Sequence, residues 1–509
     1  MEGLTGARGD ERGGGLADAA LVRRWAIVGL VLIVVAAFRS EGYYRADEHF
    51  QTIEFASFKL GRTPVEALPW EYRAQIRSWL QPGLYVVLAR AAGAVGVSDP
   101  FRLALVFRLF SGLLLWLALV SLTRSLGMLL PGPAQRRWAV PLTWLAFWTP
   151  FLAVRTSSES LSASFTVLAV VALVRATLGR EGTGPLLAAG VLFGLAFEVR
   201  FAAAVVPAGL AAWGLATRRL RLRDVGPLAA GALPVVALAG LIDRWGYGTW
   251  AFPPLDYLDV NLWRDVAAER FGSRPWYGYL SLAGTSVLAP LLLLAFAGAA
   301  TAWIRFPGHV LSASTAPFVL AHVALAHKET RFLLPVAPLA PALLVLAASR
   351  GEGWLSGLAR RPVRLLLGLL LAVNLGALAV LTLVPPRPQT AFQRYVYRSW
   401  PDRFVAVQLS PGSPWSAAGL EMHFYRPREL VLQRASSLEE AEPKRRAFLV
   451  VGSAWEQPSA PGFACEGLYQ PFPEWVRSLE AWSPALRVEG HSLHRCRRTG
   501  ETSRAVPWP

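Results

Sequence analysis

Charged residues are scarce in this chain of 509 residues, and cysteines scarcer still. Asp, Glu, Lys and Arg together make up 17% of it, whereas a soluble globular protein carries about 25%. Hydrophobic residues make up 54%, and many of them stand in long apolar runs. This composition excludes an ordinary water-soluble protein and predicts an all-α polytopic membrane protein.

Metal-binding side chains are also few. The seven histidines are scattered, and the two cysteines, Cys465 and Cys496, are not in a CxxC or Cys/His zinc spacing. We therefore expect no metal and no cofactor; nothing in the sequence supports a divalent metal. The cysteines fit either a disulfide, if the tail lies outside the cytoplasm, or two unpaired thiols.

Several catalytic motifs are absent: the P-loop, the nucleophile elbow, HExxH and a strand-linked GxGxxG. Their absence excludes the enzyme classes that depend on them. The formal net charge is +17, carried largely by arginines in short loops such as Arg218–Arg223. This distribution is typical of positive-inside topology and of a preference for anionic membrane lipids, so we expect no nucleic-acid partner.

Apolar runs divide most of the chain. They lie near residues 25–38, 82–97, 103–122, 138–154, 160–177, 184–216, 227–242, 277–303, 309–326, 332–348 and 365–384. They predict 10–12 transmembrane helices within a catalytic domain of residues 21–385. Residues 1–20 are predicted to be a disordered tail, and Arg23 and Arg24 place it in the cytoplasm.

Two topologies fit the first half of the chain. If segments 82–97 and 103–122 both cross the membrane, the arginines between 123 and 137 lie outside, against the positive-inside rule. If 82–97 only dips into the membrane and 184–216 crosses twice around Glu198-Val199-Arg200, every loop obeys the rule. In either case loop 39–80 and the chain after the last span are non-cytoplasmic.

The first non-cytoplasmic loop, residues 39–80, repeats apolar side chains at helical spacing, as at Phe50, Ile53, Phe55 and Phe58. This spacing predicts amphipathic helices lying on the membrane surface.

The composition changes after Pro385-Pro386. Residues 386–509 contain no spanning run, but segments 404–408, 430–433 and 448–451 have the pattern of short buried strands. They predict a small extracytoplasmic α/β domain.

An acidic island follows the first apolar run: Asp47-Glu48-His49-Phe50-Gln51-Thr52-Ile53-Glu54. On a helix Asp47, Gln51 and Glu54 share one face, whereas Glu48 points to another side. An acid beside a membrane span suits a general base that takes a proton from a hydroxyl. A helix N-terminus with acidic residues in its first turn explains the same pattern.

A second ionisable island stands between two apolar runs: His327-Lys328-Glu329-Thr330-Arg331. Charge in a membrane segment costs about 2.5–3.5 kcal/mol per residue, so a specific role is needed to retain it. Lys328 and Arg331, about one helical turn apart, suit a phosphate attached to a lipid. An anchor of snorkelling cations explains them too, although the intervening Glu329 weakens that alternative.

Further polar residues interrupt the apolar runs. The aromatic stretches that contain Asp243 and Trp276 suit either sugar stacking or an interfacial aromatic belt. Arg155-Thr156-Ser157-Ser158-Glu159 and Glu198-Val199-Arg200 predict salt bridges between helices.

In their order and spacing, these islands resemble glycosyltransferase family 22. This family comprises the polyprenyl-phosphate-mannose-dependent α-mannosyltransferases of GPI-anchor and lipid-linked-oligosaccharide assembly. The resemblance is closest to the GPI mannosyltransferase branch and covers about residues 25–345. It rests on Asp47-Glu48-His49-Phe50-Gln51 with Glu54, Pro69-Trp70-Glu71-Tyr72, Arg77-Ser78, Arg155–Glu159, Asp243, Tyr247-Gly248, Trp250, Asn261, Pro275-Trp276-Tyr277-Gly278-Tyr279 and His327–Phe332 with Pro335.

The chain departs from the family at two places. A His-Pro pair often precedes the Asp-Glu pair in the family, where this chain has Arg45-Ala46. A segment containing Cys-His often follows the last span, where this chain has Ser410–Ser416 with neither residue. The second departure bears on the identity of the acceptor more than on the type of reaction.

The resemblance implies a GT-C fold with its active site on the non-cytoplasmic face. It implies an inverting transfer of a hexose, expected to be mannose, from a polyprenyl-phosphate donor to a hydroxyl of a lipid-linked or glycan acceptor. Asp47 would be the general base, with Glu48 as the alternative. The donor phosphate would be bound by Lys328, Arg331 and His327. The remaining candidates for substrate binding are Gln51, Glu54, Trp70, Glu71, Arg77, Asp243, Trp276 and Glu329.

Other functions fit a polytopic membrane protein. A transporter or flippase of a lipid-linked glycan usually shows internal repeats and broken helices near the midplane. No repeat is visible here, and the ionisable islands stand at helix ends on one side. An inactive subunit of a membrane complex would not need the acid pair. We expect the protein in the plasma membrane of a bacterium or the endoplasmic reticulum membrane of a eukaryote.

Overall fold

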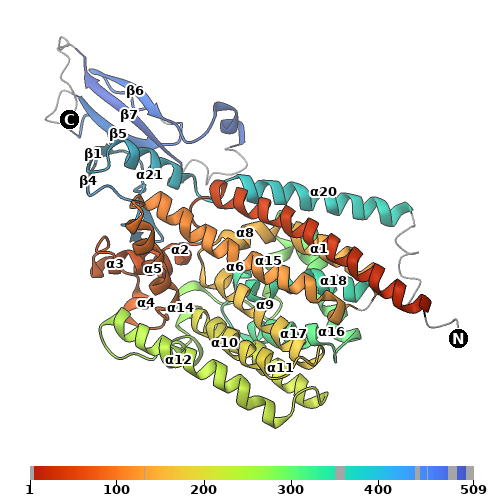
Figure 1. The fold of residues 1–509 in the computed structure, drawn as a ribbon. Coiled ribbons are helices and arrows are strands. Elements are labelled where there is room, and N and C mark those ends of the chain that lie inside the picture. Colours follow the sequence, from red (N-terminus) through yellow and green to blue (C-terminus); the bar gives the residue numbers. More distant parts are fainter. Residues whose placement is uncertain are drawn as a thin grey trace.

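The structure is a bundle of helices with a small sheet at one end (Figure 1). It is a computed structural model and describes residues 5–130, 132–349, 361–441, 447–455, 457–479 and 490–499. The prediction of an all-α membrane domain followed by a small α/β domain is confirmed by this arrangement.

The helices follow the apolar runs of the sequence. In chain order they are α1 (Thr5–Arg39), α2 (Ala46–Glu48), α3 (Glu54–Lys59), α4 (Trp70–Arg73), α5 (Leu80–Ala94), α6 (Pro100–Leu129), α7 (Pro133–Leu145), α8 (Trp148–Val154), α9 (Ser158–Thr177), α10 (Gly184–Val199), α11 (Val205–Ala216), α12 (Val225–Tyr247), α13 (Pro253–Leu258), α14 (Val266–Phe271), α15 (Gly278–Gly284), α16 (Ala289–Arg305), α17 (Val310–Ala324), α18 (Ala340–Ala348), α20 (Arg361–Leu383) and α21 (Pro388–Ser399). A π-helical turn, His49–Ile53, joins α2 to α3, and a 3-10 helix, Thr330–Leu339, leads into α18.

The length and composition of six of the described helical stretches would let each cross a membrane. These are Asp18–Arg39, Pro100–Leu129, Ser158–Thr177, Leu222–Tyr247, Thr330–Ala348 and Arg361–Ser399. Four shorter apolar helices accompany them, at Gly184–Val199, Phe201–Ala216, Ala289–Arg305 and Val310–Ala324. The peripheral helices α12 and α20 expose leucines such as Leu238 and Leu369. An apolar exterior of this kind suits contact with lipid.

Helix α9 forms the centre of the bundle. It packs against α6, α10 and the 3-10 helix, and Val167 and Val170 on it are completely buried. The Ser157 hydroxyl caps its N-terminus by accepting a bond from the Ser160 backbone N–H. This cap fixes the start of α9, and with it Glu159, at the end of the bundle that carries the sheet.

The N-terminal segment differs from its prediction. Residues 1–20 were expected to form a disordered tail, but helix α1 begins at Thr5. Alanine and leucine at positions 16–21 favour helix formation and explain the helix from there onward. Five glycines among residues 6–15 disfavour it, and nothing in the sequence explains why the helix includes them. Residues 1–4 lie outside the described residues.

Two features of the structure bear on the choice between the two topologies, which itself stays a prediction. Helix α5 stays at the sheet end of the bundle: near its start Gln81 donates to the Thr156 carbonyl at 2.9 Å. Beyond its end, Val97 packs with Phe101 and Tyr397. Run 184–216 is broken at Arg200 into α10 and α11. At 15 residues α5 is about 22 Å long, shorter than a typical bilayer core, but α10 with 16 residues and α11 with 12 residues are no better suited. Helix length therefore does not distinguish the two topologies.

Glycines allow α10 and α12 to pack closely. A Cβ at Gly190 would stand 2.1 Å from the Leu228 carbonyl oxygen, and one at Gly231 would stand 2.3 Å from that of Leu187. Gly190 and Gly194 form a GxxxG pattern, which lets two helix backbones approach within a membrane. This packing holds the ends of both helices next to loop 39–80.

The apolar side chains of loop 39–80 were predicted to lie on a membrane surface. In the structure they are buried in protein instead. Phe50, Ile53 and Phe55 are at most 4% exposed. Ile53 packs with Tyr85 of α5 and with Phe424 of the C-terminal domain. The C-terminal domain and α5 therefore cover the apolar face that the membrane was expected to cover.

The C-terminal domain contains helix α21 and a five-stranded sheet. The strands are β1 (Arg403–Gln408), β4 (Glu429–Arg434), β5 (Ala447–Ser453), β6 (Phe463–Tyr469) and β7 (His491–Arg498), in the order β4-β1-β5-β7-β6. Strands β1, β4 and β5 are parallel and β6 and β7 antiparallel; β2 (Ser416–Ala417) and β3 (Leu420–Glu421) form a separate pair. Of the two alternatives for the cysteines, the structure has the disulfide, between β6 and β7.

Glu54 joins the C-terminal domain to the bundle. Its Oε1 accepts the backbone N–H groups of His423 at 2.7 Å and Phe424 at 3.0 Å, and contacts His49 Nε2 at 2.8 Å. Thr63 donates to its Oε2 at 2.5 Å. Burial by itself would raise the pKa of Glu54, but His49 and these hydrogen bonds lower it below its ordinary value. Glu54, expected to bind substrate, is thus a structural anchor.

We expect Gly231→Ala to lower the stability of the bundle by about 1–3 kcal/mol, because the added methyl group overlaps the α10 backbone. Thermal unfolding in detergent measures the effect. Gly240→Ala is the matched control, since no atom lies within 4 Å of a Cβ at this position of the same helix. Equal melting temperatures for the two variants would contradict the close packing.

We expect Glu54→Gln to lower stability by about 2 kcal/mol at neutral pH, because charged hydrogen bonds to two N–H groups are weakened. The lowered pKa means that this stabilisation is complete above the unfolded-state pKa and lost as the pH falls through the folded-state value. The difference from wild type should therefore shrink in acid. Limited proteolysis of the C-terminal domain at several pH values measures this difference in stability. Glu66→Gln, at an exposed glutamate, is the control. A difference that does not change with pH would contradict the role of ionised Glu54 as an anchor.

Candidate active site

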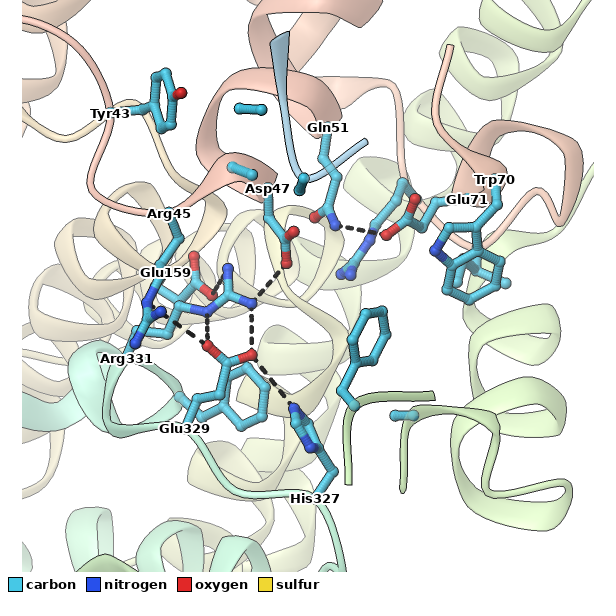
Figure 2. Close-up of a pocket in the computed structure, with 18 of the residues that line it drawn as sticks. Tyr43, Arg45, Asp47, Gln51, Trp70, Glu71, Glu159, His327, Glu329 and Arg331 are labelled. Carbon is cyan, nitrogen blue, oxygen red and sulfur yellow. Dashed lines mark hydrogen bonds and ion pairs between the residues drawn. The ribbon is translucent and has the colours of Figure 1, made fainter. Parts of the chain in front are cut away.

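A cavity of about 580 Å³ opens where the bundle meets the C-terminal domain. Its walls come from loop 39–80, the ends of α9 and α10, the segment that follows α12, the His327 island and the C-terminal domain. Figure 2 shows Asp47, Glu159, Glu329 and Arg331 pointing toward one another at one side of it. The two ionisable islands of the sequence, about 280 residues apart, thus face one cavity.

Arg331 lies at the centre of three carboxylates. Its guanidinium donates to Asp47 Oδ2 at 2.6 Å and to both oxygens of Glu329 at 2.8 and 2.9 Å. Its Nη1 is 3.7 Å from Glu159 Oε1. The planar guanidinium can bind several carboxylates at once because its five N–H groups are fixed in a fork. The side chain of Asp47 is 38% exposed, so a substrate can still reach its carboxylate.

Three further groups complete this cluster. Arg200 Nη1 contacts Glu159 Oε1 at 3.0 Å, which is the predicted salt bridge between helices. His327 Nε2 lies 3.3 Å from Glu329 Oε1, and its Nδ1 lies 2.8 Å from the Gly272 carbonyl. Burial alone would raise the pKa of Glu329, but Arg331 and His327 lower it. Glu329 is therefore ionised at neutral pH and holds Arg331 in place.

A second carboxyl group, Glu71, stands across the cavity from this cluster. Gln51 donates to its Oε1 at 2.9 Å (Figure 2). Burial raises the pKa of Glu71; the charge of Arg77 partly offsets this and that of Asp47 adds to it. Trp70 lies on the same wall, with the Arg270 guanidinium 4.5 Å from its ring. Gln51, Trp70, Glu71 and Arg77 thus line the cavity, as substrate-binding residues would.

Besides Glu54, four predicted site residues do not line the cavity. Buried Glu48 accepts backbone N–H groups from Tyr44 and Thr156, both at 2.8 Å. Lys328 donates to the carbonyls of Leu325 and Arg274, so it braces a loop. Asp243 accepts the Trp79 N–H at 2.6 Å. The Trp276 side chain is 70% exposed on the surface.

The π-helical turn explains why Glu54 also leaves the cavity. On a regular helix Asp47, Gln51 and Glu54 would share one face. The turn His49–Ile53 has more residues per turn than an α-helix, so the residues after it are rotated. Asp47 and Gln51 line the cavity, whereas Glu54 points to the C-terminal domain.

Sequence reasoning missed several residues of the cavity. Arg45 lines it with a half-exposed side chain, 4.0 Å from Glu329; its signal was its place directly before the acid pair. Glu159 and Arg200 were assigned only to a salt bridge, although charge at an apolar helix end was the available signal. The C-terminal domain contributes Gly412, Ser413, Ser416, Ala417, Ala418 and His491. The signal for the first three was their place in Ser410–Ser416, where the family often has a Cys-His segment; His491 had no signal in the sequence.

The described part of the chain brings together no set of side chains suited to a metal ion. No group of three His, Cys, Asp or Glu side chains in the described ranges is arranged to hold a metal ion. The three carboxylates nearest one another surround the Arg331 guanidinium instead.

Curated relatives of the chain are mannosyltransferases. It is 27% identical over 333 residues to "Mannosyltransferase APTG1" of Arabidopsis thaliana, covering 62% of this chain and 57% of the relative. It is 29% identical over 370 residues to "GPI mannosyltransferase 3" of Aspergillus fumigatus, covering 62% and 46%. For "GPI alpha-1,2-mannosyltransferase 3" of Xenopus laevis the identity is 26% over 313 residues, covering 60% and 56%. The chain thus matches roughly half the length of these relatives.

Solved structures share the fold. The crystal structure of ArnT from Cupriavidus metallidurans bound to undecaprenyl phosphate superposes with a TM-score of 0.51 at 14% sequence identity, covering 93% of this chain and 97% of ArnT. This likeness confirms the GT-C fold expected from the sequence. The model of the Alg9-like mannosyltransferase family matches residues 25–387, which include both ionisable islands. The chain therefore belongs to the Alg9-like mannosyltransferase family, glycosyltransferase family 22.

Proposed function

We propose that this protein is an integral-membrane mannosyltransferase. It transfers mannose from a polyprenyl-phosphate donor to a hydroxyl of a lipid-linked or glycan acceptor on the non-cytoplasmic face. The observation that carries the proposal is the accessible Asp47 carboxylate paired with Arg331 in the cavity. Family membership supports the reaction, and the names of the relatives support mannose and a GPI-type acceptor. Arginines between α11 and α12, at the end of the bundle away from the sheet (Figure 1), support the orientation.

Asp47 is the general base of the proposed reaction. The acceptor hydroxyl gives its proton to Asp47 as its oxygen attacks the anomeric carbon of the donor. The bond from that carbon to the phosphate oxygen breaks, so the configuration inverts and polyprenyl phosphate leaves. Buried Glu48 serves the structure instead, because its carboxylate is occupied by the backbone at Thr156 and Tyr44.

Arg331 links the proton transfer to the departure of the phosphate. When Asp47 takes the proton it becomes neutral, so Arg331 has one carboxylate fewer to compensate. At the same moment negative charge grows on the leaving phosphate oxygen, where a positioned cation stabilises the transition state. Glu329 and Glu159 hold Arg331 throughout. Half-exposed Arg45 provides the first contact with the phosphate.

We expect Asp47→Asn to lower kcat by about 10²–10⁴-fold, because the acceptor proton loses its base. The assay uses purified protein in lipid with labelled polyprenyl-phosphate-mannose and candidate acceptors, and thermal unfolding verifies the fold. Asp265→Asn is the matched control, since Asp265 is an exposed aspartate lining the same cavity outside the Arg331 cluster. Full activity in Asp47→Asn would remove Asp47 from the mechanism.

We expect Arg45→Gln to raise the donor KM about tenfold, because one charge-assisted contact with the phosphate is lost. Lys328→Met should lower the melting temperature and leave the donor KM unchanged, since Lys328 braces the loop through two carbonyls. Steady-state kinetics at varied donor concentration separates the two roles. A raised donor KM in Lys328→Met, with an unchanged melting temperature, would show that Lys328 binds the donor phosphate.

A further inference from the structure

The two sides of the cavity differ in charge. The bundle side carries Asp47, Glu159, Glu329, Arg200 and Arg331. The C-terminal domain adds Arg387 at the start of α21, whose guanidinium lies 5.3 Å from the Tyr43 ring. Its other lining residues are uncharged: Gln389, Gly412, Ser413, Ser416, Ala417, Ala418 and His491. Burial lowers the pKa of His491 to about 4, so its imidazole is neutral at physiological pH. Apart from Arg387, the wall from the C-terminal domain is therefore uncharged, and the part of it that includes His491 suits an uncharged ligand rather than a phosphate.

This wall is fixed in position. Gln389 and Gln393 of α21 donate to the Pro414 carbonyl, and Gln389 donates also to that of Ser416 at 3.1 Å. The Ser416 hydroxyl bonds the Ser413 carbonyl at 3.1 Å. Because Gly412 and Ala417 present little more than backbone, the wall leaves space for a bulky ligand. A preorganised wall of this kind loses little entropy on binding.

His491 is the polar side chain of this wall that lacks a partner. It begins strand β7, is 4% exposed and has its ring 5.8 Å from that of Phe392. Its buried Nδ1 has no hydrogen-bond partner among the described residues, and no described residue bonds its Nε2. Because Nδ1 is buried, Nε2 is the ring nitrogen that a ligand hydroxyl in the cavity would bond.

We propose that the C-terminal domain forms the acceptor subsite, and that His491 hydrogen-bonds a hydroxyl of the acceptor glycan. This inference rests on the proposed function. The donor carries its sugar directly on a membrane-bound phosphate, so its charged part belongs with the arginines of the bundle. An acceptor glycan that extends away from the membrane would meet the domain that Figure 1 shows at the end of the bundle. The matched family segment ends at residue 387, so this subsite comes from a part of the chain outside it.

The test compares the KM values of the two substrates. The probes are labelled polyprenyl-phosphate-mannose and a synthetic alkyl mannobioside as acceptor. His491→Phe, which keeps the ring volume and removes both nitrogens, should raise the acceptor KM about tenfold and leave the donor KM and melting temperature unchanged. His491→Gln, whose amide can replace a ring nitrogen, should recover most of the affinity. A purely structural role would lower stability and kcat without this selective change.

His494→Phe is the matched control. His494 lies on the same strand, bonds Ser492 at 3.0 Å and does not line the cavity. An unchanged acceptor KM in His491→Phe, with transfer by the wild type intact, overturns the acceptor subsite and leaves the proposed function standing. An equal rise of both KM values also overturns it. Absence of transfer by the wild type overturns the proposed function. In that case the acceptor subsite is tested by binding alone, with the mannobioside titrated and tryptophan fluorescence recorded. Equal affinity of the wild type and His491→Phe for the mannobioside would refute the subsite.

Discussion

One guanidinium organises the candidate site. Arg331 bonds Asp47 from loop 39–80 and Glu329 from its own island, and lies near Glu159 at the start of α9. Glu159 and Asp47 lie on elements whose positions are fixed by other contacts. Helix α9 is held by its apolar core, and loop 39–80 is held by α5 and the C-terminal domain. Without Arg331 three acids would face one another at the membrane boundary, which is unfavourable in a medium of low dielectric constant.

The sequence was sufficient for the fold class and for the two ionisable islands that face the cavity. Apolar runs identified the membrane helices, and charge between such runs identified Asp47 and Arg331, because burying it without function is costly. Strands β1, β4 and β5 were visible as apolar segments. Strands β6 and β7 were not, since β7 reads His-Ser-Leu-His-Arg-Cys-Arg-Arg and has no alternation of apolar and polar residues.

The assignment of individual side chains needed coordinates. A π-helical turn changed the face of Glu54, and no residue type specifies such a turn. Lys328 and Arg331 looked equivalent in sequence, but Lys328 reaches two carbonyls and Arg331 reaches the carboxylates. The wall at residues 412–418 depends on how the C-terminal domain docks. That docking uses contacts between segments more than 300 residues apart, which no local pattern encodes.

The composition of the Arg331 cluster has a consequence for selectivity. Asp47, Glu159 and Glu329 balance Arg331, Arg200 and Arg45, three charges of each sign. A balanced cluster projects little field, so it does not draw in soluble anions such as inorganic phosphate from a distance. A substrate held by a lipid needs no such attraction, because it arrives by diffusing within the membrane. The site therefore binds an anion only through short-range contacts. Anions attached to membrane lipids reach these contacts because they are confined to the bilayer.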